Sequence, residues 1–220
     1  MSPSGVYLRN ATRMWRSLEP SQASESAALF RAEFPGFVRM IALAPGAVEP
    51  PAGRPFTYED AFGPPVDGVD RLPIMVRPPG AAPAPPAARA AEVRSAADLA
   101  VAERVMIDGF PLRRYQPLRT GTALPPRVLE LPGWRVWLAY CDGVPAAGAY
   151  TYDDGESNGV YWVATLPEHR GHGLGRAVMT AAIAVAPERP HSLVATDVGR
   201  PLYESVGFTE VGQVNWHSRG

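Results

Sequence analysis

A glycine-rich turn between two apolar segments is the feature that most constrains the fold of this chain. Residues 160–164 (VYWVA) predict a strand, residues 170–175 (RGHGLG) a turn, and residues 173–185 a helix. Glycine tolerates positive φ and lets the backbone approach a ligand closely, because it has no Cβ. The free N–H groups and the dipole of a helix N-terminus attract anions. The segment therefore predicts a strand–turn–helix unit that binds phosphate.

The spacing of the glycines separates this turn from two common nucleotide-binding turns. They fall as Gly-x-Gly-x-Gly, whereas a dinucleotide-binding turn has Gly-x-Gly-x-x-Gly and a P-loop ends in Lys followed by Ser or Thr. The chain contains no lysine, and Arg170 and Arg176 supply the positive charge around the turn. Similar turns also serve as purely structural connections, so the turn by itself leaves both interpretations open.

Two motifs together resemble the GCN5-related N-acetyltransferase (GNAT) family. From Arg170 the turn has the pattern Arg-x-x-Gly-x-Gly, which is similar to the family's pyrophosphate loop, and residues 202–208 (LYESVGF) are similar to its Leu-Tyr-x-x-x-Gly-Phe helix end. The resemblance covers residues 91–220. It implies an α/β (α+β) protein with a GNAT fold, in which helices flank a mixed, mostly antiparallel, twisted sheet. It also implies acetyl-CoA as co-substrate.

A segment rich in proline and alanine divides the chain. Residues 78–90 read PPGAAPAPPAARA, and such a segment favours an extended, semi-rigid connector. We expect it to link residues 1–77 to the GNAT domain, residues 91–220. In the first part, residues 23–34 predict a helix, and residues 37–44 and 72–77 predict strands. This part is interpreted as a packing extension or, by resemblance, as a degenerate acetyltransferase-like half-domain.

The residues after the linker predict a regular series of elements. Strands are expected over 91–94, 134–140, 144–152, 160–165, 191–196 and 208–216, and helices over 96–108, 173–185 and 200–205. Ser95 is a suitable cap for the first helix, and Asp142-Gly143 predicts a type I′ hairpin turn. The expected buried side of the first helix comprises Ala96, Leu99, Ala100, Val105 and Met106. This order of elements is that of the GNAT fold.

The resemblance assigns roles to individual residues. Val163 would offer a backbone N–H to the thioester carbonyl, where negative charge develops. Tyr203 would protonate the coenzyme A thiolate, since a phenol with a pKa of about 10 can donate to a nearby thiolate, although it could also be a core tyrosine. Phe110, Tyr115 and Trp162 would line the acceptor pocket or pack in the core. The full set expected to bind acetyl-CoA is Val163, Thr165, Arg170, Gly171, His172, Gly173, Leu174, Gly175 and Arg176.

The general base has no clear signal in the sequence. Asp153, Asp154 and Glu156 lie on a turn beside the central strand, and a solvated hairpin tip explains them equally well. The sequence departs from the family pattern at Thr196, where the family often has asparagine, and at Gly199, where it often has another small residue, and both changes are expected to weaken the usual placement of the coenzyme A thiolate. The four histidines lack metal-ligand spacing, so we expect no metal.

Composition narrows the class of protein. With 46% hydrophobic residues, 20% charged residues and a formal net charge of −1, the chain gives no sign of a nucleic-acid or membrane partner. A single cysteine, Cys141, cannot form an internal disulfide, which favours the cytoplasm. We expect a monomeric or homodimeric N-acetyltransferase acting on the amine of a small molecule or peptide. The alternatives are use of another acyl-CoA, including its decarboxylation, and a non-catalytic acyl-CoA-binding regulatory module.

Overall fold

The computed structural model describes residues 3–18, 68–110 and 116–218. Every element predicted after the linker is present, whereas the predictions for residues 23–34 and 37–44 lie outside the described residues. The first helix, α1, was not predicted. The elements are α1 (Pro3–Leu18), β1 (Gly68–Arg77), β2 (Ala90–Glu92), α5 (Ala96–Gly109), η3 (Pro126–Leu129), β3 (Trp134–Cys141), β4 (Val144–Asp153), β5 (Asn158–Thr165), η4 (Pro167–His169), α6 (Leu174–Ala184), β6 (His191–Val194), α7 (Arg200–Ser205) and β7 (Thr209–Ser218).

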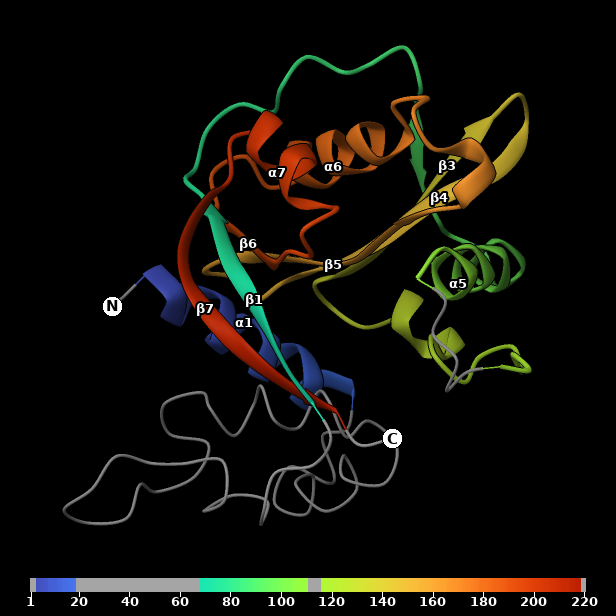
Figure 1. Cartoon of the computed structure of the whole chain (residues 1–220). Coiled ribbons are helices and arrows are strands. Elements are labelled where there is room, and N and C mark those ends of the chain that lie inside the picture. Colours follow the sequence, from blue (N-terminus) through green and yellow to red (C-terminus); the bar gives the residue numbers. More distant parts are fainter. Residues whose placement is uncertain (1–2, 19–67, 111–115, 219–220) are drawn as a thin grey trace, which may run out of the picture.

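The seven strands of the described residues form one sheet in the order β2-β3-β4-β5-β6-β1-β7 (Figure 1). Neighbouring strands are antiparallel, except for the parallel pair β5 and β6. This mixed, mostly antiparallel sheet with flanking helices confirms the predicted GNAT fold. Strand β1, which precedes the linker, lies between β6 and β7. The segment before the linker therefore supplies an internal strand of the same sheet.

The two faces of the sheet have separate cores. Helices α1 and α5 cover one face, and α6 and α7 cover the other (Figure 1). Tyr7, Met14, Leu99 and Met106 belong to the first core. Trp137, Val178, Met179, Tyr203 and Phe208 belong to the second. The two faces of the sheet therefore carry different sets of side chains.

Helix α5 begins where the sequence predicts, since the Ser95 side chain accepts a hydrogen bond from the Asp98 N–H. Two of its predicted buried residues are wrong, because Ala96 is exposed and Ala100 is only half-buried. Glu103 is buried instead. The reason is that residues 121–124 cover this side of the helix and donate hydrogen bonds to the Glu103 carboxylate.

Residues 78–90 form an extended segment over α6, which we call the strap (Figure 1). The N–H of Gly80 donates to the carbonyl of Pro187, just beyond the end of α6. Pro86 lies beside Gly173, just before the beginning of α6. The strap therefore follows α6 from its C-terminal to its N-terminal end, where it reaches the glycine-rich turn.

Candidate functional site

Strands β5 and β6 pair only where both begin. Asn158 is opposite His191, and Gly159 is opposite Ser192. Beyond these pairs, β5 continues to Thr165 with no further pairing to β6 among the described residues. The carboxyl ends of adjacent parallel strands are a common place for ligands, because their backbone groups are accessible there. The glycine-rich turn follows directly from this end of β5.

A β-bulge distorts β5 in its diverging part. Gly148 of β4 pairs with Ala164, and Tyr150 pairs with Tyr161, so Trp162 and Val163 between them have no register partner in β4. Trp162 has a φ of 50°, which is uncommon for a bulky residue. A bulge leaves an extra residue unpaired and bends its strand. The backbone of Val163 is thus outside the regular ladder at the position expected to contact the thioester.

The glycine-rich turn has the backbone that an anion site requires. Gly171 and Gly173 are exposed and have φ values of 82° and 75°, in the left-handed region. Gly173 is also the N-cap of α6, and no side chain caps the helix there. The N–H groups of the first helical turn are therefore left without a side-chain partner. Leu174 is buried in the second core and fixes the start of the helix.

The two arginines around the turn are tied to neighbouring elements. Arg170 Nε donates to the Thr165 carbonyl at 3.3 Å, and its Nη2 lies 3.5 Å from the carbonyl of Gly109, at the end of α5. Arg176 Nη1 donates to the carbonyl and hydroxyl of Ser205 on α7. Both contacts use only neutral acceptors, so the positive charges remain uncompensated by these partners.

The other predicted turn residues have local structural roles. His172 Nδ1 donates to the carbonyl of His169 at 3.1 Å, which stabilises the turn. A Cβ on Gly175 would lie 3.0 Å from Leu202 Cδ2 and 3.6 Å from Thr165 Oγ1. The third glycine therefore allows α7 and the end of β5 to pack against the first turn of α6.

Tyr203 lies on α7 in the second core and is 6% exposed. Its ring makes an edge contact with Phe208, at a centroid distance of 6.2 Å, and burial raises the pKa of its phenol. A Cβ on Gly199 would lie 2.9 Å from the Tyr203 ring and 3.3 Å from Thr196 Oγ1. Glycine at position 199 thus leaves room for the tyrosine, and Thr196 faces the same small space.

The predicted acceptor-pocket residues lie on the opposite face. Phe110 and Trp162 are partly buried against the first core, and the Trp162 ring meets the Tyr150 ring edge-on at 5.5 Å. Tyr115 lies outside the described residues. In the described part of the site, the glycine-rich turn therefore lies on the α6 face of the sheet, and the aromatic side chains lie on the α5 face.

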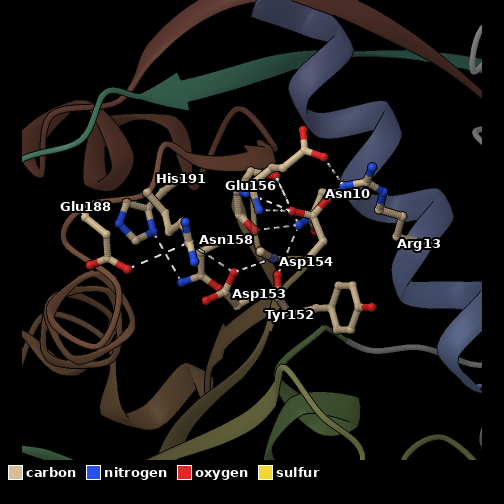
Figure 2. Close-up of polar contacts among 12 residues, drawn as sticks. Asn10, Arg13, Tyr152, Asp153, Asp154, Glu156, Asn158, Glu188 and His191 are labelled. Atoms are coloured by element: carbon tan, nitrogen blue, oxygen red, sulfur yellow. Dashed lines mark hydrogen bonds and ion pairs between the residues drawn. The ribbon is translucent and has the colours of Figure 1, made fainter.

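The carboxylates considered as bases are held in ion pairs at the beginning of β5, opposite the glycine-rich turn. The Asp154 side chain is 1% exposed and pairs with Arg13 of α1 at 3.2 Å, while its Oδ1 accepts from the N–H groups of Glu156 and Ser157 (Figure 2). Glu156 also pairs with Arg13, at 2.9 Å. Asp154 is neither a free general base nor a solvated turn residue, because both of its carboxylate oxygens already have partners.

Two buried polar residues outside the glycine-rich turn had no functional signal in the sequence. Asn10 of α1 donates to the carbonyls of Tyr152 and Ser157 and accepts from the Tyr161 hydroxyl at 2.7 Å. Glu103 of α5 is 1% exposed, and its carboxylate accepts three N–H groups at 2.7, 2.7 and 2.9 Å. Helix α5 also carries Asp98, Arg104 and Asp108, so the sequence did not distinguish Glu103 from its other charged residues.

His191 is buried where β5 and β6 pair. Burial, with a contribution from Arg77, lowers the pKa of its imidazole to about 4. Asn158 Nδ2 lies 3.3 Å from His191 Nδ1 (Figure 2). Residues 3–18, 68–110 and 116–218 contain no cluster of three side chains suited to a metal ion. In the same ranges no helix has the length and apolarity needed to cross a membrane.

Part of the chain is similar to proteins of known family. Residues 132–210 match the acetyltransferase (GNAT) domain. A GCN5-related N-acetyltransferase from Kribbella flavida is 26% identical with a TM-score of 0.51, and the match covers 70% of this chain and 61% of that one. A GNAT-family protein from Novosphingobium aromaticivorans is 20% identical with a TM-score of 0.49, covering 78% and 71%. No curated protein matches the sequence. The matched residues contain β5, the glycine-rich turn and Tyr203, so this part of the chain is a GNAT acetyltransferase domain.

Proposed function

We propose that the protein transfers an acetyl group from acetyl-CoA to the amine of a small molecule or peptide, by direct attack of the amine on the thioester. The observation that carries this proposal is the exposed, left-handed Gly171–Gly173 turn at the diverging end of β5 and β6. Its uncapped N–H groups and the positive charge of Arg170 and Arg176 suit the diphosphate of coenzyme A.

The bulge on β5 supports a position for the rest of the donor. Running from the turn along the diverging strands, the pantetheine arm would meet the backbone between Thr165 and Val163. The Val163 N–H, which lies outside the regular ladder, would donate to the thioester oxygen as it becomes negatively charged. The amine would approach from the face of Trp162 and Phe110. Donor and acceptor would then meet between the diverging ends of β5 and β6.

Tyr203 would complete the reaction. As the C–S bond breaks, the sulfur leaves as a thiolate, and the tyrosine hydroxyl would give it a proton. Burial raises the pKa of this phenol, so the tyrosine is protonated when the thiolate forms. The attacking nitrogen loses its own proton to solvent, and the products are an amide and coenzyme A.

Calorimetric titration of acetyl-CoA tests the donor site. We expect Gly173→Asp to abolish binding, because it places a carboxylate where the diphosphate would lie. Gly155→Asp is the matched control, since Gly155 has a φ of 86° with open space around it and lies on the turn at the other end of β5. Equal binding by all three proteins would contradict this site. Release of coenzyme A thiol over a panel of amines then tests transfer.

A further inference from the structure

Arg77 fixes the beginning of the strap. Its guanidinium is buried and donates to the carbonyls of Pro78, Gly80 and Ala81, at 3.2, 3.2 and 2.6 Å. The same side chain donates to the Val206 carbonyl at the end of α7. Four carbonyl partners hold one cation, so the strap leaves β1 in a defined direction.

The end of the strap is fixed by the sheet. Ala90 begins β2, and register pairs place Ala90, Ala139, Ala147 and Thr165 in one row across four strands. Three strand spacings of about 4.8 Å put Ala90 roughly 14 Å from Thr165. The strap therefore ends at the same end of the strands as the one from which the glycine-rich turn begins.

Between these ends the strap passes the glycine-rich turn. The Cβ of Pro86 lies 3.9 Å from where a Cβ on Gly173 would be. Ala82 and Ala88, on either side of Pro86 in the sequence, pack against the core under α6. An anion bound by the first turn of α6 would consequently lie close to the strap.

Arg89 is the charged residue of the strap. It is exposed, and the flanking Ala88 and Ala90 pack against the second core. Within the described residues its guanidinium has no ion pair. Three extended residues span at most about 10 Å, so the long Arg89 side chain can approach a ligand that projects from the turn beside Pro86. Guanidinium groups bind phosphate oxygens in a bidentate manner.

We propose that Arg89 is a further acyl-CoA-binding residue, whose guanidinium pairs with a phosphate of coenzyme A. The inference rests on the proposed function of the glycine-rich turn. Coenzyme A carries a diphosphate and a ribose 3′-phosphate at the same end of the molecule, and both have the chemistry that a guanidinium binds. The strap is then one wall of the donor site, opposite the opening between β5 and β6.

Calorimetric titration of coenzyme A into the full chain tests Arg89. We expect Arg89→Gln to weaken binding about tenfold, the effect of one lost charge-assisted hydrogen bond. Arg94→Gln is the matched control, because Arg94 follows the same strand, has an 80% exposed side chain and pairs with Glu92. The control should bind like the wild type. Thermal unfolding should be unchanged in both variants.

Titration with 3′-dephospho-coenzyme A identifies the phosphate. Loss of the difference between wild type and Arg89→Gln assigns Arg89 to the 3′-phosphate, and persistence of the difference assigns it to the diphosphate. Pro86→Glu should weaken binding of both ligands, because it brings a carboxylate to the turn. Equal affinity of wild type and Arg89→Gln for coenzyme A would overturn this inference alone. Failure of the wild type to bind would overturn it together with the proposed function.

Discussion

The Tyr203 phenol remains protonated at assay pH, because burial raises its pKa above the usual value. We expect Tyr203→Phe to lower kcat about 100-fold, the lower end of the effect of a positioned acid. Affinity for acetyl-CoA should be unchanged, because the phenylalanine ring can keep the contact with Phe208. Steady-state kinetics and calorimetry separate the two effects. An unchanged kcat would leave Tyr203 with a packing role only.

His191 makes stability depend on pH. Its pKa is about 4 in the folded protein against 6.5 in the unfolded chain, so the unfolded state binds more protons as pH falls through 6.5. The free energy of unfolding should therefore fall by about 2 kcal/mol between pH 7 and pH 5 through this group, and its contribution should level off below pH 4. In His191→Gln this component should disappear. Urea unfolding at each pH measures it, and parallel pH profiles for the two proteins would contradict it.

Residues whose role is local were predictable, and residues whose role depends on distant segments were not. Gly171 and Gly173 follow from the conformation of one turn. Glu103, in contrast, is buried because residues 121–124 fold back onto it. Asp154 could not be placed from its own turn either, since its partner Arg13 comes from the first helix.

At the scale of elements, one carboxylate of α5 accepts the hydrogen bonds that fix the segment between α5 and β3. Glu103→Ala would leave three N–H groups without their acceptor, and we expect a loss of roughly 3 kcal/mol in the free energy of unfolding. Glu103→Gln should lose less, because one oxygen remains as an acceptor. Glu130→Ala, at an exposed position, is the control and should change little. Urea unfolding of the four proteins gives the comparison. Equal losses in the alanine variants would contradict a special role for Glu103.

The helices and strands after the strap could be predicted from local periodicity, whereas the order of the strands in the sheet could not. Turns, caps and apolar repeats act over a few residues, so the hairpin of β3 and β4 and the unit of β5 and α6 were both predicted. Strand β1 was also predicted as a strand. Its place between β6 and β7 arises from pairing with segments far along the chain, for which a single strand carries no signal.

At the scale of the whole molecule, the segment before the strap and the domain after it share one sheet. Helix α1 binds the turn between β4 and β5 through a hydrogen bond of Asn10 and an ion pair of Arg13. Strand β1 lies between β6 and β7. The strap joins these parts while crossing the face that carries the glycine-rich turn. The sheet thus contains strands from both sides of the strap, whereas the family match covers only residues 132–210.

Removal of residues 1–77 tests this dependence. Strand β7 pairs with β1 over nearly its whole length, and α1 covers buried residues of the first core. We expect residues 78–220 to lack a cooperative thermal transition, because β7 and the edge of β6 would lose their described partner and apolar side chains would be exposed. Co-expression with a separate 1–77 fragment should restore the transition, since the missing contacts are non-covalent. The full chain, followed by circular dichroism under the same conditions, is the reference. A cooperative transition of 78–220 alone would show instead that the residues after the strap fold independently and that β1 only extends their sheet.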